Sequence, residues 1–288
     1  MSASPPAPAP SHRFSALVLA GSRGGGGGDD LASAQGEQHR ALIPIRGVPM
    51  LVRVIRTLRA APSIGPILVS IDDPAALDGV AELRELVAAG ALELRRSENS
   101  PSRSVVAVLE AQPAGQPVLV TTADHPLLTP AMVEHFTQAC ARPDADLCVG
   151  LVTATLLRAH YPESTRTYLP MRDDLYSGAN LFGFLTPQAK RAAEFWVRAE
   201  ALRKQPWRLA LAFGPRALFL FWRRRLDLDA AFERISDVIG ARARAVRMPF
   251  AEAAIDVDRA SDLALATQIL AQREARSPHG GMASSRAD

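Results

Sequence analysis

The chain has 288 residues, of which 48% are hydrophobic and 22% are charged, and its net charge is only +3. This composition excludes a globally disordered chain, and the small net charge gives no reason to expect a nucleic-acid partner. Lys190 and Lys204 are the only lysines. Any site that usually uses lysine should therefore carry arginine here.

Targeting and redox signals are sparse. The N-terminal segment is rich in Pro and Ala rather than apolar behind a cationic start, which does not indicate a signal peptide. The most hydrophobic stretch, 209–222, is shorter than the roughly 20 residues that a bilayer requires. The only cysteines, Cys140 and Cys148, fit neither a zinc site nor a disulfide framework. We therefore expect a cytoplasmic protein with two buried thiols.

The folded domain is expected over 13–273, between unstructured tails at 1–12 and 274–288 that lack hydrophobic periodicity. Within it, short apolar runs alternate with segments of helical periodicity. The predicted strands are 16–20, 67–71, 92–95, 118–122, 147–151 and 243–248, and the predicted helices are 50–60, 75–88, 104–111, 130–141 and 261–272. Residues 187–239 are predicted to form a mostly helical insert near the C-terminal third.

Continuous apolar strands separated by helices predict an α/β fold whose parallel sheet is covered on both faces. Ligands of such sheets bind at the carboxyl ends of the strands. Three loops are expected at that edge, at 21–40, 98–103 and 123–128. The candidate functional residues should therefore be sought there.

The first of these loops holds five consecutive glycines, Gly24–Gly28, between Arg23 and Arg40. Glycine lets backbone N–H groups approach an anion closely, and arginine neutralises polyphosphate. The loop is neither a Walker motif nor a GxGxxG turn. Taken alone, a glycine run is as well explained by a flexible linker.

Acidic residues follow two apolar segments that are far apart in the sequence. Asp124 follows the strand 118–122, and Asp256 and Asp258 follow a late apolar segment. A carboxylate that leaves a buried strand must cap a turn or face a cation. Two carboxylates from separate strand ends can together hold one Mg²⁺, so a magnesium site is one interpretation and a turn residue the other.

Several short motifs occur in an order that resembles a known superfamily. They are LAGSR (19–23), RAL (40–42), RGVPML (46–51), SENSPSRSV (97–105), TTADHPLL (121–128), SGANLFGF (177–184) and AIDVDRASDLALA (254–266). Together they resemble the MobA-like nucleotidyltransferases over nearly the whole folded chain. The resemblance implies a Rossmann-like three-layer α/β/α fold with a mostly parallel sheet, of the nucleotide-diphospho-sugar transferase (GT-A) type. It also implies that an NMP group passes from an NTP to a phosphorylated acceptor, with release of pyrophosphate.

The same resemblance assigns roles to individual residues. Asp124 and Asp258 match the ligands of Mg²⁺, with Asp256 as the second choice. Arg23 matches an arginine that contacts the β- and γ-phosphates, and Arg40 stands where the family usually has lysine. Binding of the nucleotide is implied for Leu19, Ala20, Gly21, Ser22, Pro101, Arg103 and Ser104.

The acceptor region of the superfamily corresponds here to the polar stretch 161–177 and to Asn180. We expect Arg166 and Arg172 to bind the phosphate of the acceptor as bidentate forks. A solvated basic loop is the alternative. His125 follows Asp124, but a phosphate acceptor is already anionic near neutral pH and needs no base, so we expect this histidine to pack rather than to transfer protons.

The stretch 207–225 places Phe and Trp residues beside arginines. One interpretation is an interfacial helix that contacts an anionic membrane, with a lipid-precursor phosphate as acceptor. The simpler interpretation, which we favour, is an amphipathic lid or the face of a homodimer.

Two other functions stay open at this point. A GT-A glycosyltransferase shares the fold and uses a nucleotide donor with a metal, but its Asp-x-Asp would stand where this chain has Asp124-His125-Pro126. A non-catalytic nucleotide-binding protein that kept the fold is the second alternative.

Overall fold

The computed structural model describes residues 13–21, 30–142, 144–202, 214, 219, 223 and 225–276. The predicted tail 1–12, residues 277–288 and most of the predicted membrane or dimer segment 207–225 lie outside the described residues. The strands are β1 (Phe14–Leu19), β2 (Pro44–Ile45), β3 (Val48–Pro49), β4 (Ile64–Ile71), β5 (Glu93–Arg96), β6 (Val118–Thr122), β7 (Leu147–Thr153), β8 (Leu169–Pro170), β9 (Leu175–Phe184) and β10 (Ala243–Arg247).

The helices are α1 (Asp30–Ala34), α2 (Met50–Ala60), α3 (Ala81–Ala88), α4 (Pro101–Ala111), α5 (Pro130–Cys140), α6 (Ala154–His160), α7 (Lys190–Ala201), α10 (Leu228–Ile239) and α11 (Ala260–Arg276). Four short 3-10 helices accompany them, namely η1 (Arg40–Leu42), η2 (Pro74–Leu77), η3 (Pro187–Ala189) and η4 (Ala251–Ala254).

One sheet organises the molecule, in the strand order β10-β7-β9-β6-β1-β4-β5, with β8 paired to β9. β1 is parallel to both of its neighbours, β4 and β6, and β4–β5 and β7–β10 are parallel pairs as well. β9 runs antiparallel to β6, β7 and β8. The predicted mostly parallel sheet is therefore confirmed, and β2 and β3 form a small separate hairpin.

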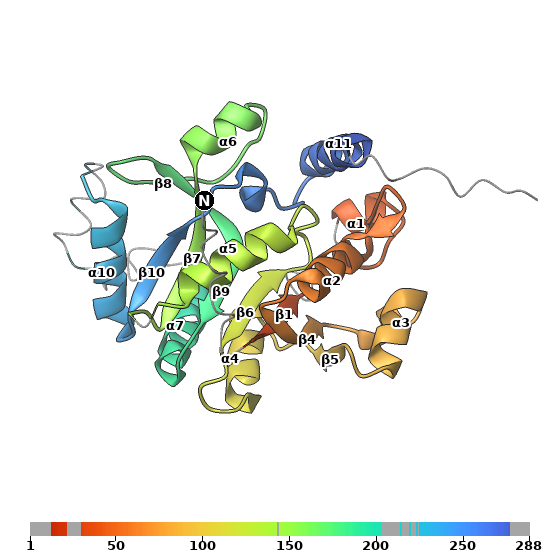
Figure 1. Cartoon of the computed structure of the whole chain (residues 1–288), viewed down its shortest axis with the longest axis horizontal. Coiled ribbons are helices and arrows are strands. Elements are labelled where there is room, and N and C mark those ends of the chain that lie inside the picture. The colour runs from red at the N-terminus through yellow and green to blue at the C-terminus, as the bar shows by residue number, and fades with distance from the viewer. Residues whose placement is uncertain are drawn as a thin grey trace, which may run out of the picture.

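Helices cover both faces of this sheet (Figure 1). Successive side chains of a strand point to opposite faces, and β1 shows this directly. Ala16 and Val18 belong to a core shared with α2, α5 and α11, whereas Leu17 belongs to a second core shared with α4, α7 and α10. The result is the expected three-layer α/β/α architecture.

Two predicted elements match the structure residue for residue, and one predicted helix is divided into two. The helix 50–60 is α2 and the strand 118–122 is β6. The predicted helix 75–88 is divided into η2 and α3. The Asp73 carboxylate accepts a hydrogen bond from the Ala75 N–H and so caps η2 as a separate turn, and Gly79 between the two helices disfavours a continuous one.

The C-terminal half contains structure that the sequence pattern did not reveal. α6 was not expected; the Thr153 side chain caps it by accepting a hydrogen bond from the Leu156 N–H. The stretch expected to be irregular, 161–177, contains β8 and the start of β9. α11 continues to Arg276 rather than ending at 272. The described parts of 187–239 are helical in η3, α7 and α10.

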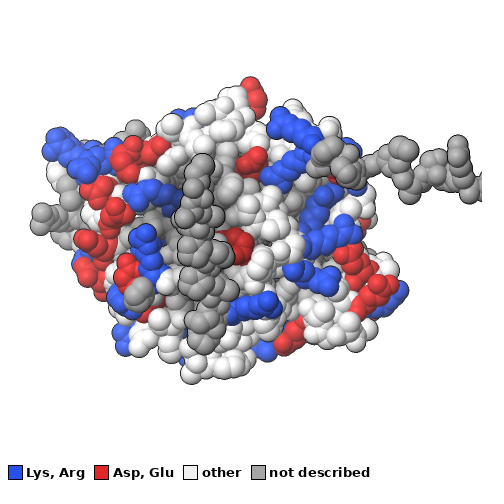
Figure 2. All heavy atoms as spheres, viewed as in Figure 1, with Lys and Arg blue, Asp and Glu red and all other residues white. Residues whose placement is uncertain are grey.

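On the face shown in Figure 2, basic and acidic side chains are interspersed in small groups. Within the described parts of the chain, no helix combines the length and the apolar character needed to cross a bilayer.

Candidate functional site

The carboxyl ends of β1, β4, β5 and β6 meet at one edge of the sheet, where the sequence places its polar loops. Beyond β1 and β6, backbone hydrogen bonds continue from Ala20 N to Ser70 O (2.8 Å) and from Ala123 N to Leu19 O (2.9 Å). These bonds hold the first residues of the loops in fixed positions. The predicted nucleotide residues Leu19, Ala20 and Gly21 therefore lie at this edge, and Ser22 and Arg23 lie outside the described residues.

Gly21 packs closely against two polar side chains from neighbouring strands. A Cβ at this position would lie 2.9 Å from Asp72 Oδ1 and 3.3 Å from Ser97 Oγ. The Ser97 hydroxyl in turn donates to Asp72 Oδ1. Glycine is thus required by the close approach of the β1 loop to the ends of β4 and β5.

The segment between β5 and α4 is ordered by serine side chains. Ser100 caps α4 by accepting from the Arg103 N–H, and Pro101 occupies the first turn, where its lack of an N–H costs nothing. The Ser104 hydroxyl accepts from the Glu98 N–H at 2.9 Å. Ser104 is buried and Arg103 is exposed, so the hydroxyl of Ser104 shapes the loop whereas Arg103 can reach a ligand.

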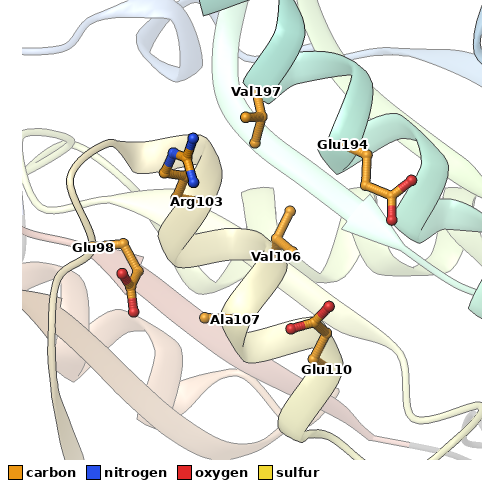
Figure 3. Close-up of a pocket in the computed structure, with 7 residues that line it drawn as sticks. All are labelled: Glu98, Arg103, Val106, Ala107, Glu110, Glu194 and Val197. Atoms are coloured by element: carbon orange, nitrogen blue, oxygen red, sulfur yellow. The ribbon is translucent and has the colours of Figure 1, made fainter.

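A surface cavity of about 360 Å³ lies beside this segment, between α4 and α7. Figure 3 shows Arg103 and Val106 of α4 facing the side of α7 that carries Glu194 and Val197. Its lining residues are Glu98, Arg103, Val106, Ala107, Glu110, Glu194 and Val197. Three carboxylates and one guanidinium make it mixed in charge, and its lining includes none of the three aspartates predicted to bind metal.

Two acidic segments far apart in the sequence come together at the end of β6. The Val257 N–H donates to the Asp124 carbonyl oxygen at 2.8 Å. This bond ties the segment before α11 to the loop after β6, so that the backbone next to Asp258 lies beside that of Asp124. Arg40, on η1, donates from Nη1 to Asp258 Oδ1 at 2.6 Å.

The donors at this point suit a hard cation. Among the described residues, no three His, Cys, Asp or Glu side chains gather as a metal site. Mg²⁺ in nucleotide sites is commonly held by one or two carboxylates, with phosphate and water oxygens completing the shell. Asp124 and Asp258 supply two carboxylates of this chemical kind.

Asp256 has different surroundings. Its Oδ1 accepts from Arg166 Nη1, and its Oδ2 accepts from Asn180 Nδ2 at 2.9 Å. Asn180 has a φ of +50°, a left-handed conformation that asparagine tolerates better than most residues, and the pairing of β7 with β9 shifts beside it. The structure thus brings Arg166 and Asn180 to the same carboxylate, that of Asp256.

The two arginines predicted to bind the acceptor form ion pairs with different acidic residues. Arg166 has only 7% of its side chain exposed and pairs with Asp256 and Asp262. Arg172 has 64% exposed and pairs with Asp227, at the start of α10, at 3.1 Å. The two guanidiniums are therefore engaged by different carboxylates, Arg166 in the interior and Arg172 at the surface.

His125 lies in the interior beneath Asp124, with none of its surface exposed. Burial lowers the pKa of His125 to about 4, although the nearby Asp256 carboxylate acts in the opposite direction. The imidazole is therefore neutral near pH 7 and enclosed by protein.

Two site residues were not singled out from the sequence. Asp72 ends β4 as Asp124 ends β6, so the same argument about a carboxylate leaving a buried strand would have found it. Asp262 is buried and accepts hydrogen bonds from the N–H groups of Asp258 and Arg259. The sequence feature that could have identified Asp262 is its place as an acidic residue in the first turn of a predicted helix.

Comparisons with known proteins agree with this geometry. A family model described as the MobA-like NTP transferase domain matches residues 16–171. A hypothetical transferase from Thermus thermophilus is similar in structure, with 30% identity and a TM-score of 0.71, and the match covers 87% of this chain and 99% of that one. A search of curated proteins gives no significant match.

Two further structures share the fold at lower identity. One is CMP:2-keto-3-deoxy-manno-octonic acid synthetase in complex with CTP, at 15% identity and a TM-score of 0.55, covering 91% of this chain and 100% of that one. The other is 4-diphosphocytidyl-2C-methyl-D-erythritol synthase from Anaerococcus prevotii, at 14% identity and a TM-score of 0.54, covering 90% of this chain and 96% of that one.

Proposed function

Since the chain belongs to the MobA-like NTP transferase family, we propose that it is a nucleotidyltransferase that moves an NMP group from an NTP to a phosphorylated small molecule. The observation that carries this proposal is the hydrogen bond from the Val257 N–H to the Asp124 carbonyl oxygen. This bond joins two acidic segments, far apart in the sequence, at the carboxyl ends of the strands, which we call the nucleotide edge of the sheet. The CMP:2-keto-3-deoxy-manno-octonic acid synthetase and the 4-diphosphocytidyl-2C-methyl-D-erythritol synthase described above have the same fold.

The nucleotide would lie across the carboxyl ends of β1, β4 and β6. The backbone from Leu19 to Gly21 would contact it, with Arg103 and the loop before α4 beside it. Its phosphates would face Arg40, because a guanidinium offers up to five N–H donors and binds phosphate oxygens in pairs. The Asp72 carboxylate would repel phosphates, so we place the nucleoside, rather than the triphosphate, near β4.

Asp124 and Asp258 would hold Mg²⁺, which neutralises phosphate charge and orients the triphosphate when it is bound. A phosphate oxygen of the acceptor attacks the α-phosphorus, the bond from that phosphorus to the bridging oxygen of the β-phosphate breaks, and pyrophosphate leaves. The acceptor is already anionic, so the protein need supply no general base. It contributes positioning and charge neutralisation.

The acceptor could be a soluble phosphate monoester or a lipid-precursor phosphate, and Arg172 is the exposed arginine on the predicted acceptor segment that could meet it. The test mixes the protein with each of the four NTPs, Mg²⁺ and a panel of phosphate monoesters, and follows pyrophosphate. Release that depends on both substrates is expected. NTP binding without any release would instead favour a non-catalytic nucleotide-binding protein.

Asp124→Asn tests the metal ligand directly. The change keeps the size of the side chain and removes its charge, so we expect turnover to fall on the order of 100-fold or more while the fold is kept. Circular dichroism and thermal unfolding check the fold. Asp237→Asn, at an exposed carboxylate of α10 that pairs with Arg234, is the matched control. Equal turnover in Asp124→Asn and the control contradicts the metal assignment.

A further inference from the structure

Arg166 is a buried arginine with carboxylates on two sides. Its Nη1 donates to Asp256 Oδ1. Its Nη2 donates to the Asp256 carbonyl oxygen at 2.8 Å and to Asp262 Oδ1 at 3.1 Å, and its Nε donates to Ser164 Oγ at 3.3 Å. One side chain thus binds the backbone and carboxylate of Asp256, before α11, and the carboxylate of Asp262, in the first turn of α11.

The second oxygen of each carboxylate is engaged as well. Asp256 Oδ2 accepts from Asn180 Nδ2 at 2.9 Å. Asp262 Oδ2 accepts from the N–H groups of Asp258 and Arg259, at 3.2 and 3.0 Å. Every oxygen of the two carboxylates therefore has a donor within the protein, and the donors to Asp262 Oδ2 are the backbone N–H groups on either side of the Asp258 side chain.

Electrostatics explain why these groups depend on one another. Asp262 is 7% exposed, and the Asp256 side chain is 19% exposed. Two carboxylates this close in the interior repel each other, and Arg166 is the cation that contacts both. Removing one partner of a buried ion pair leaves an uncompensated charge, which is far more disruptive than the loss of an exposed pair.

We propose that Arg166 is a positioning residue that fixes the turn 256–262 and thereby aims the Asp258 carboxylate at the metal and nucleotide. Asp256 and Asn180 then serve the same turn, Asp256 as the hub of the network rather than as a metal ligand, and Asn180 as its second donor rather than as an acceptor contact. The role of Asp258 in this inference rests on the proposed function, whereas the ordering of the turn by Arg166 does not.

The first experiment measures the turn in the protein without substrate. Arg166→Met keeps an unbranched apolar stem and removes the charged guanidinium. Hydrogen exchange of the peptide that contains residues 257–262 should become at least about tenfold faster, because the Asp258 and Arg259 N–H groups lose a fixed Asp262 as acceptor. Arg166→Lys should restore part of the protection.

The matched control is Arg247→Met. Arg247 also contacts two carboxylates, Asp173 at 3.7 Å and Asp229 at 3.4 Å, but it lies on β10 with 48% of its side chain exposed. Its loss should leave exchange of the 257–262 peptide unchanged. The inference is overturned if exchange in Arg166→Met equals that of the wild type, or if Arg247→Met produces the same acceleration.

The second experiment separates positioning from acceptor binding. Mn²⁺ serves as the probe, because carboxylate sites that take Mg²⁺ also suit Mn²⁺. The Mn²⁺ concentration that gives half-maximal pyrophosphate release should rise about 10- to 100-fold in Arg166→Met, the range typical of residues that orient metal ligands, and the KM for the acceptor should stay constant. A raised acceptor KM with an unchanged Mn²⁺ requirement would overturn the inference and restore the predicted phosphate contact.

Asp256→Asn tests the reassignment of Asp256. The amide keeps an oxygen for Arg166, so we expect a smaller change in the Mn²⁺ requirement than Asp258→Asn produces, and an equal change would overturn this part. If Arg166→Met fails to fold, Asn180→Ala removes a single donor from the same network, and it should accelerate exchange of the same peptide to a lesser degree. A wild type that releases no pyrophosphate refutes the proposed function, while hydrogen exchange still decides the role of Arg166.

Discussion

The resemblance noted from the sequence implies a lysine at the position of Arg40, and the surroundings of Arg40 show what an arginine contributes there. Its guanidinium lies 2.6 Å from Asp258, with a quarter of the Arg40 side chain exposed. Lysine would carry the same charge as a compact point, whereas arginine has a planar fork that can bind a carboxylate and a phosphate at once. In the proposed function, Arg40 would therefore link the bound phosphates to Asp258, the carboxylate predicted to hold the metal.

Replacing Arg40 tests whether turnover requires the planar guanidinium or only its positive charge. Arg40→Met should lower kcat on the order of 100-fold, because it removes a cation from the developing pyrophosphate. Arg40→Lys should retain most of the charge effect and lose less than about tenfold. Pyrophosphate release under saturating NTP and Mg²⁺ gives both values. Equal losses in the two variants would mean that the geometry of the guanidinium matters more than its charge.

The sequence predicts which residues belong to this site, but it does not predict which residues pair with one another. Asp124 and Asp258 stood out because each follows an apolar segment, and the structure places both at the expected edge. Arg166 stood out as an arginine in the acceptor region, yet its partners Asp256 and Asp262 lie 90 and 96 residues away. No local pattern encodes a pairing over that distance, so burial of Arg166 could only come from the fold.

Asp146 shows how one side chain joins three elements, at the start of β7, at the start of β10 and before η3. Its Oδ2 accepts from the Arg242 N–H at 2.8 Å, and its Oδ1 accepts from Arg242 Nη2 at 3.0 Å. Oδ1 also accepts from the Thr186 hydroxyl at 2.8 Å. The hydrogen bonds from the Arg242 side chain, with those from its backbone and from Thr186, lower the pKa of Asp146 to about 2.

This pKa predicts a loss of stability in acid. The carboxylate is charged and bonded in the folded chain down to about pH 2, whereas in the unfolded chain it takes up its proton near pH 3.8. The contribution of Asp146 is therefore complete above pH 4 and is lost as the pH falls from about 4 to 2, and it amounts to about 1 to 2 kcal/mol. Denaturant unfolding at a series of pH values measures it.

Asp146→Asn should lower the free energy of unfolding by about 1 to 3 kcal/mol at pH 7, and its difference from the wild type should shrink below pH 4. Asp144→Asn is the control, since Asp144 is 62% exposed and its contact with Arg244 is 3.8 Å long. A difference between Asp146→Asn and the wild type that persists unchanged at pH 2.5 would contradict the assignment of this pKa.

At the scale of elements, prediction succeeded where one local signal dominates. α2 and β6 were predicted with their observed bounds because helical periodicity and a continuous apolar run leave little choice. β9 was harder, since its antiparallel direction depends on β6 and β7 on either side of it. Gly150 illustrates this dependence, because a Cβ there would lie 3.2 Å from the Cβ atoms of both Ala179 and Leu181. Such close approach is decided by tertiary packing rather than by the sequence around Gly150.

At the scale of the whole molecule, the two thiols lie deep in the half of the sheet away from β4 and β5. Cys140 ends α5 and is 2% exposed, and Cys148 on β7 is not exposed at all. Gly183 of β9 packs closely against the Cys140 thiol, since a Cβ at position 183 would lie 3.1 Å from Cys140 Sγ. Burial also raises the pKa of the Cys140 thiol. A thiol reagent can therefore reach either sulfur only when this part of the domain opens.

Thiol labelling thus reports whether the domain opens as one unit. An NTP that binds the folded chain at 100 times its Kd stabilises that chain by about 2.7 kcal/mol. If the two sides of the sheet unfold together, labelling of Cys140 and Cys148 by an aromatic disulfide should slow about 100-fold at that NTP concentration, because the opening that exposes them also destroys the nucleotide site. The NTP is the one that binds most tightly in a thermal-shift screen, and binding is confirmed by calorimetry. Labelling that stays constant while the NTP binds would mean that α5 and β7 open independently of the nucleotide edge. The continuous core that connects α2, α5 and α11 argues for opening as one unit.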